Sequence, residues 1–344
     1  MNIRTNGLFV PRIRCCPSWA AAVAAFSIGT AAFGAAPAPS PSYHAVGHYS
    51  VASSPGGDLK VDAAARKIYA IAGNSVLVLD ADSGATTATI SPTPGASALA
   101  VVPALGRGFS ANAGDGSVTI FDLKTNAVVK AVAVGGKNLS ALYYDASLKR
   151  VFVASEDGTL AAIDATSGAV TGTVKLGGKL AGLIGNDYGQ VYVSAEDQNV
   201  LHVVDSQSLA FLGDDPVAPG VGPRGLGIDP VGRRIFVACA NGKIPVIDTD
   251  AGFVFSVSQA GAGTSAILFD RTKVAPPKGD APWKGQVLAS APDGSLTVMK
   301  MNAFISYTYH DTVKITEGAR AVAFDSKANH VLVSLPNEIL VLGR

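Results

Sequence analysis

The sequence is poor in the residues that form covalent cross-links, redox centres and metal sites. Its 344 residues include three cysteines, two tryptophans and five histidines. Cys15 and Cys16 lie near the N-terminus, so Cys239 is the only cysteine in the rest of the chain and has no disulfide partner there. An apolar run surrounds Cys239, which favours a buried and unreactive thiol, because reactive cysteines need an exposed, electropositive setting.

Short motifs of catalytic and cofactor-binding sites are also missing. The chain has no His-Glu-x-x-His metal motif, no phosphate-cradling P-loop and no Gly-x-Ser-x-Gly nucleophile motif. These motifs supply ligands or a nucleophile at fixed spacing, so without them the case for an enzyme is weak. We expect no cofactor and no metal site.

Charged residues make up only 15% of the chain, against about a quarter in a typical soluble protein. The basic and acidic residues nearly balance, at 27 and 26, and give a formal net charge of +1. A nucleic-acid partner is therefore not expected, because phosphate recognition depends on a concentrated field of lysine and arginine. The 48% hydrophobic content excludes a disordered chain, and the length is ample for one large all-β unit.

Residues 1–34 are predicted to be a secretory signal peptide. Three arginines precede an apolar, alanine-rich stretch at residues 19–33, and a Pro/Ser-rich linker follows at residues 35–42. The apolar stretch is shorter than the roughly 20 residues that cross a bilayer as a helix, so we expect cleavage after Gly34 and no transmembrane anchor. Cleavage removes three arginines and no acid, which changes the formal charge from +1 to −2. The mature protein is then expected to be periplasmic or secreted.

The remainder of the chain repeats one pattern. Each copy has a short apolar strand that ends in Asp, a second apolar strand, a polar turn, and a third strand that again ends in Asp; the clearest copy covers residues 142–164. Intervals of 42, 42, 41, 43, 52 and 43 residues separate the ends of the third strands. These ends define seven copies, at Asp80, Asp122, Asp164, Asp205, Asp248, Lys300 and Gly343.

Turn residues and a fourth strand complete the pattern. Asp-Gly, Asn-Gly or Ser-Gly dipeptides separate the strands and favour hairpin turns, and a strand of alternating character follows the third, as at residues 127–134. Four antiparallel strands per period of this length are typical of a propeller blade. The sequence therefore predicts an all-β fold, a seven-bladed β-propeller of residues 43–344.

The two ends of the chain predict how the ring closes. The last copy has strands near residues 320–325, 330–334 and 338–342, and then the chain ends without a fourth strand. Residues 43–51 look like a fourth strand that lacks the three before it. A ring of blades must close or leave an unpaired sheet edge, so we expect this N-terminal strand to complete the last blade.

Several repeats carry a family resemblance. The stretch Gly-Pro-Arg-Gly-Leu-Gly-Ile-Asp-Pro at residues 222–230, followed by Arg-Ile-Phe-Val-Ala at 234–238 and Val-Ile-Asp at 246–248, resembles the YVTN-type, YncE-like β-propeller repeats of exported bacterial proteins. The resemblance covers residues 43–344. It implies a propeller that binds a ligand, a surface or nucleic acid.

The candidate binding site lies at the mouth of the propeller channel. Ligand sites of propellers gather where the loops between blades meet the loops between second and third strands, as in the mouths of barrels. The loops between blades contribute Lys137, Asn138, Lys179, Arg224, Ser265 and Arg320, and the other loops contribute mainly acids. Arg224 and Arg320 are predicted to bind a carboxylate or phosphate by forked hydrogen bonds. The alternative is that they pair with the acidic turns.

These features favour an exported, monomeric, non-enzymatic binding or scaffold protein that holds a small anionic ligand or a protein partner. A lactonase-like hydrolase on the same fold is the enzymatic alternative, although its catalytic residues cannot be mapped onto this chain. Quinone-dependent dehydrogenases are less consistent with the sequence, because their propeller blades are rich in tryptophan. The Asp at the end of each third strand is interpreted as a turn cap.

Two further groups of residues leave alternatives open. His44 and His48 share one face of the N-terminal strand, and ring closure brings His330 into the same blade, but sequence spacing does not assemble the convergent ligands that a metal site needs. Trp283 lies in an insertion at residues 271–286. It is either a partner anchor or a plug that packs on its own blade.

Overall fold

The structure is a computed structural model that describes residues 42–51, 57–271, 284–303 and 306–344. These residues belong to one compact unit, Ser40–Arg344. The predicted signal peptide and Trp283 lie outside the described residues. Within the residues that are described, no helix has the length and hydrophobicity needed to cross a bilayer.

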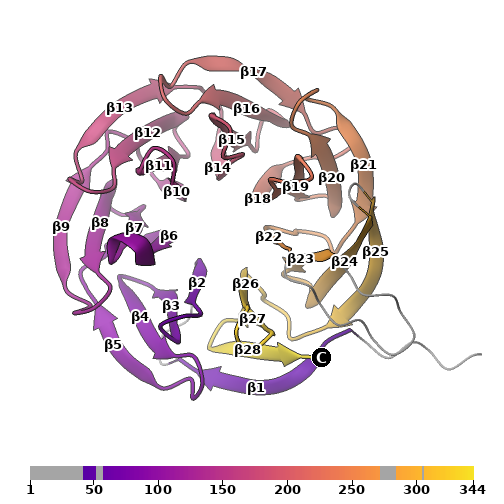
Figure 1. Ribbon diagram of the computed structural model, residues 1–344, viewed down its shortest axis with the longest axis horizontal. Coiled ribbons are helices and arrows are strands. Elements are labelled where there is room, and N and C mark those ends of the chain that lie inside the picture. Colours follow the sequence, from indigo (N-terminus) through magenta and orange to yellow (C-terminus); the bar gives the residue numbers. More distant parts are fainter. Residues whose placement is uncertain (1–41, 52–56, 272–283, 304–305) are drawn as a thin grey trace, which may run out of the picture. The chain divides into compact units, whose positions relative to one another are not determined.

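The unit consists of seven four-stranded antiparallel sheets, and Figure 1 shows them as blades arranged in a ring. Blade 1 contains β2 (Leu59–Asp62), β3 (Lys67–Ala72), β4 (Ser75–Asp80) and β5 (Thr86–Ile90). Blade 2 contains β6 (Ala96–Val102), β7 (Arg107–Asn112), β8 (Ser117–Asp122) and β9 (Val128–Ala133), with the short 3₁₀ helix η1 (Pro103–Leu105) after β6. Blade 3 contains β10 (Leu139–Asp145), β11 (Arg150–Ser155), β12 (Thr159–Asp164) and β13 (Val170–Lys175).

The remaining blades repeat this order. Blade 4 contains β14 (Leu180–Gly185), β15 (Gln190–Ala195), β16 (Val200–Asp205) and β17 (Phe211–Pro216). Blade 5 contains β18 (Pro223–Asp229), β19 (Arg234–Cys239), β20 (Lys243–Asp248) and β21 (Val254–Gln259). Blade 6 contains β22 (Ala266–Asp270), β23 (Gly285–Ala291), β24 (Ser295–Ala303) and β25 (Ser306–Lys314). Blade 7 contains β26 (Ala321–Asp325), β27 (His330–Ser334), β28 (Glu338–Gly343) and β1 (His44–Ser50). The predicted seven-bladed propeller is confirmed.

The apolar core lies between neighbouring blades. Between blades 2 and 3, for example, Phe109 and Ile120 pack with Val151 and Ile163, and all four side chains are fully buried. The second and third strands of a blade are covered on both faces, so nearly all their residues are buried and most are apolar, with buried polar exceptions such as Ser110, Asn112 and Thr119 in blade 2. The fourth strands lie at the circumference in Figure 1, and there exposed and half-buried residues alternate, as in β13. The position of a strand in the blade therefore determines whether its sequence is mainly apolar or alternates between apolar and polar residues.

The Asp at the end of each of five third strands caps the turn that follows. In blade 3, the carboxylate of Asp164 accepts hydrogen bonds from the backbone N–H of Ser167 at 2.6 Å and from its hydroxyl at 2.8 Å. These bonds hold the pKa of Asp164 below its ordinary value. The same arrangement recurs at Asp80, Asp122, Asp205 and, with backbone donors, Asp248. The interpretation of these residues as turn caps is confirmed.

The N-terminal strand closes the ring as expected. Strand β1 pairs antiparallel with β28, and the register joins His44 to Gly343, His48 to Leu340 and Ser50 to Glu338. Blade 7 is thus built from both ends of the described chain, in the order β1-β28-β27-β26. Because β1 and β28 come from opposite ends of the described chain, their pairing within blade 7 joins these ends and holds the ring shut.

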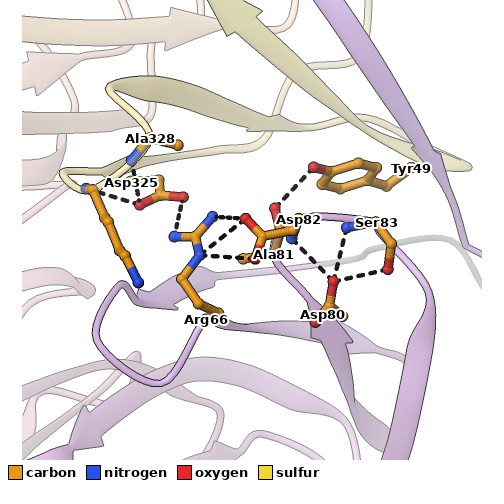
Figure 2. Close-up of polar contacts among 9 residues, drawn as sticks. Tyr49, Arg66, Asp80, Ala81, Asp82, Ser83, Asp325 and Ala328 are labelled. Atoms are coloured by element: carbon orange, nitrogen blue, oxygen red, sulfur yellow. Dashed lines mark hydrogen bonds and ion pairs between the residues drawn. The ribbon is translucent and has the colours of Figure 1, made fainter.

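Polar contacts also join blade 7 to blade 1, as Figure 2 shows. Arg66, in the turn between β2 and β3, donates from Nη1 to Asp325 of blade 7 at 2.6 Å and from Nη2 to Asp82 of blade 1 at 2.6 Å. The side chain of Asp325 is only 2% exposed. The hydroxyl of Tyr49 in β1 donates to the carbonyl of Ala81 in blade 1 at 2.9 Å. The contact between blades 7 and 1 therefore combines a buried ion pair with a hydrogen bond from a tyrosine hydroxyl.

Candidate functional site

The loops between blades and the loops between second and third strands meet on one face of the propeller. The backbone N–H of Glu156 donates to the carbonyl of Asn138 at 3.0 Å, and that of Glu196 donates to the carbonyl of Lys179 at 2.8 Å. In blade 5, Ala240 makes the same contact with Gly222 at 3.0 Å. We call this surface the loop face. The predicted convergence of the two loop sets is confirmed.

A cavity of about 880 Å³ runs along the centre of the ring at this face. First strands of all seven blades line it, and Figure 1 shows these strands nearest the centre. Small and aliphatic residues such as Ala141, Gly182, Leu226 and Ala323 make up much of its wall. Charged and hydroxyl side chains join them, among them Asp58, Ser97, Ser140, Glu196, Arg224, Ser265 and Arg320. Binding sites are usually concave and mainly apolar; this cavity is concave, but polar and apolar groups share its wall about equally.

Serine hydroxyls tie neighbouring blades together around this cavity. Ser140 of blade 3 donates to the carbonyl of Leu180 in blade 4 at 2.8 Å, and Ser194 of blade 4 donates to the carbonyl of Arg224 in blade 5 at 2.7 Å. A Cβ at Gly182 would lie 1.8 Å from that same carbonyl oxygen of Arg224. Glycine is required at this position because the two blades approach so closely. These contacts fix the spacing of the first strands and hence the shape of the cavity.

The charged groups at the mouth form a network across blades 3, 4 and 5. Glu196 accepts from Nε of Arg224 at 2.7 Å and lies 2.8 Å from Nζ of Lys179. Lys179 also lies 3.5 Å from Glu156. Burial raises the pKa of Glu196, but the hydrogen bonds from Lys179 and Arg224 outweigh it and hold the pKa below its ordinary value. The hydrogen bond to Glu196 raises the pKa of Lys179.

Residues 114–304 match the PQQ_2 family, which is described as outer membrane protein assembly factor BamB. The match spans more than half of the 344 residues. The chain belongs to this family. The match supports the propeller repeat that the sequence predicts, but it gives no support to the YVTN-type subgroup. No curated protein matches the chain.

The BamB family match places the charged network in context. It covers blades 3 to 5 completely, so Glu156, Lys179, Glu196 and Arg224 all lie within it, whereas Arg320 lies beyond its end at residue 304. The network therefore lies in the part of the ring that matches the family, whereas Arg320 lies in blade 7, outside the match.

The structure brings together three of the six predicted site residues. Arg224, Ser265 and Arg320 line the cavity, and Lys179 reaches its edge through Glu196. Lys137 and Asn138 are exposed on the loop face but do not line the cavity. Instead, the backbone N–H of Lys137 donates to Asp157 at 3.2 Å, and the carbonyl of Asn138 accepts from Glu156.

The alternative that the arginines pair with the acidic turns is confirmed for Arg224, although the sequence did not single out Glu196 as its partner. Arg224 and Glu196 are 28 residues apart and lie in different blades, so no local pattern predicts their contact. The available signal was that one loop set is basic and the other acidic, because opposite charges attract once both sets share a face. Asp58 and Lys60, which pair at 2.9 Å in the cavity wall, were also missed.

The histidines do not form a metal site in the part of the chain that the structure describes. His44, His48 and His330 do lie in the same blade, as expected. However, Nδ1 of His48 lies 3.1 Å from Glu338, and no group of three or more histidine, cysteine or acidic side chains converges among the described residues.

Proposed function

We propose that this chain is an exported, non-enzymatic scaffold that holds a protein partner at the channel mouth during the assembly of outer-membrane proteins. Membership of the BamB family supports the assembly role, since the family is described as an outer membrane protein assembly factor. The predicted signal peptide supports export to the periplasm or beyond. No specific observation among the described residues favours the lactonase-like alternative.

The observation that carries the proposal is the pairing of opposite charges at the mouth. A free anion would have to displace Glu196 from Arg224 and Lys179, so the network is poorly suited to a small anionic ligand. A protein surface carries both signs and can exchange pairs with the network. Arg224 and Lys179 are 39% and 45% exposed, so acidic groups of a partner can contact them while a basic group of the same partner pairs with Glu196. The mixed network therefore favours a protein partner.

A charge-swap experiment tests this role. The variants are made in a Lys179→Gln background, so that the new arginine does not face a second cation. There the single variants Arg224→Glu and Glu196→Arg break the internal pair, while the double variant restores it with reversed polarity. We expect the double variant to melt like the Lys179→Gln background but to recover at least about tenfold less of its partners from solubilised envelope, measured by cross-linking and quantitative mass spectrometry. Lys137→Glu is the matched control, because Lys137 is exposed on the same face outside the cavity.

The outcomes separate the two ligand classes. Unchanged recovery with the double variant would contradict a docking role for the mouth. If inorganic phosphate or citrate binds the wild type, and Arg224→Ala together with Arg320→Ala abolishes that binding, the small-anion alternative is favoured. Cell fractionation tests export independently, because a mature chain that begins near residue 35 is expected outside the cytoplasm.

A further inference from the structure

The outer strand of blade 5 differs from the other outer strands of the ring. Strand β21 has the sequence Val-Phe-Ser-Val-Ser-Gln and contains no charged residue, proline or glycine. Natural edge strands are usually protected by such residues, because an unpaired edge is a template for another strand. The other outer strands carry charged, histidine, glycine or proline residues, except β5, which exposes threonines. The bulge between third and fourth strands is common to the blades, so it does not protect β21 specifically.

Large apolar side chains are exposed along β21 at every second position. Within the strand, Phe255 is 43% exposed and Val257 40%, and Phe253, just before the strand begins, is 51% exposed; the residues between them are half-buried. Side chains with a period of two are the pattern that a β-strand presents to a partner. Isolated apolar residues on a surface are ordinary, but this regular row on an unprotected edge is not.

The free edge of β21 supplies backbone groups for such a partner. In the sheet order β18-β19-β20-β21, the strand pairs only with β20 among the described strands. Its opposite edge therefore presents unpaired N–H and C=O groups, which are specific for an extended chain rather than for a helix or a lipid.

A half-buried carboxylate marks one end of this edge. Asp215 of β17 reaches the start of β21, since a Cβ at Gly252 would lie 2.3 Å from its Oδ1. Burial, and secondly the neighbouring Asp214, raise the pKa of Asp215. Asp214 is paired with His202 at 2.6 Å, but no cation of the described residues forms an ion pair with Asp215. An incoming lysine or arginine would neutralise this carboxylate.

We propose that β21 is a second docking surface, at which another protein adds an extended strand antiparallel to β21. The incoming strand carries apolar side chains at alternate positions, which pack on Phe255 and Val257. It carries a basic residue at its C-terminal end, which in an antiparallel pair lies opposite the start of β21 and therefore near Asp215. This surface is separate from the channel mouth, so either proposal can fail without the other.

Peptide binding tests the proposal on the full chain. The probe is a fluorescent peptide of alternating valine and threonine that ends in two lysines. We expect Val257→Lys to weaken its binding by about tenfold or more, measured by fluorescence anisotropy, because the lysine replaces an apolar contact and adds a like charge. Val129→Lys is the matched control, since Val129 is 53% exposed on the outer strand β9 of blade 2, and it should bind like the wild type.

Two further probes separate strand addition from other modes. A version of the peptide with alternate backbone amides N-methylated should not bind, because it cannot complete the ladder of hydrogen bonds. A version that ends in two glutamates should bind more weakly than the lysine peptide, and Asp215→Asn should remove this difference. Circular dichroism melting confirms that the variants are folded.

Several results would overturn the proposal. Equal peptide binding by the wild type and Val257→Lys, or equal binding of the N-methylated peptide, rules out strand addition at β21. Sedimentation that shows wild-type dimers, absent in Val257→Lys, would assign the edge to a second copy of this chain rather than to another protein.

Discussion

Replacement of Arg66 by alanine is expected to destabilise the closure of the ring. Arg66 is the cation that neutralises Asp325, and the two side chains are only 14% and 2% exposed. The guanidinium of Arg66 donates hydrogen bonds to Asp82 and to Asp325. These bonds raise the pKa of Arg66, and the bond to Asp82 has the larger effect, so the guanidinium is charged at every pH of interest. Removing it leaves a buried carboxylate at the contact between blades 7 and 1 without its counter-ion (Figure 2).

The expected cost follows from what remains around Asp325. Breaking a buried ion pair costs roughly 3–5 kcal/mol. Asp325 keeps hydrogen bonds from the backbone N–H groups of Lys327 at 3.0 Å and Ala328 at 3.3 Å, which places the cost at the lower end. The pair with Asp82 adds little, because Asp82 is 67% exposed. We therefore expect Arg66→Ala to lower the free energy of unfolding by about 3 kcal/mol.

Arg233 in blade 5 provides the matched control. It occupies the corresponding turn, its φ of 56° is close to the 53° of Arg66, and it pairs with Asp250 at 2.6 Å. Both members of that pair are about half exposed, so Arg233→Ala should cost less than about 1 kcal/mol. Because the backbone strain is the same, the difference between the two variants isolates the buried pair.

Urea unfolding followed by circular dichroism measures both variants. A lower midpoint at unchanged slope shows lost stability, and the double variant Arg66→Ala with Asp325→Asn should recover part of the loss, because the amide leaves no buried charge. Equal costs for Arg66→Ala and Arg233→Ala would refute the reasoning.

Three further predictions concern packing, acid stability and reactivity. Gly84→Ala should lower the free energy of unfolding in urea by about 3 kcal/mol, because the added Cβ would lie 2.0 Å from the ring of Tyr49 and the φ of Gly84 is +73°. Gly73→Ala is the control: its φ is +60° but the space around it is open, so the loss should be about 1 kcal/mol. In the folded state, hydrogen bonds from the following turn lower the pKa values of the turn-capping aspartates of blades 1 to 4. Their contribution to stability is therefore present at neutral pH and is lost as the pH falls below about 4. A urea midpoint that stays constant from pH 7 to about pH 2 would contradict this. Burial raises the pKa of Cys239 to about 12, so iodoacetamide at about pH 8 should label it only after unfolding, as mass spectrometry can show.

The repeat pattern in the sequence was sufficient for the fold. Hairpin turns are local, so a dipeptide such as Asp-Gly and a terminal Asp such as Asp164 fix the strand boundaries within each blade. The missing fourth strand of the last copy, together with the strand at residues 43–51, also fixed the closure, because a ring cannot leave one blade incomplete.

The candidate site was only partly predictable. The repeat phase placed Arg224 and Arg320 on the correct loops, because every blade turns at the same points. Whether an arginine is free or paired depends on the side chains of the next blade, and Glu196 is reached only through the ring geometry. The expectation of a simple anion clamp came from the loops alone.

The division between sequence and tertiary structure follows the range of the interactions. The sequence by itself determined the number of blades, their strands and the turn caps, because these rest on hydrogen bonds within about 40 residues along the chain, apart from the pairing of β1 with β28 in blade 7. Only the tertiary structure decided that Arg66 pairs with Asp325, 259 residues away, and that the apolar row of β21 lies on an open edge. An apolar strand has the same sequence pattern whether a neighbour covers it or not, and the packing of the blades alone settles which strand is left exposed.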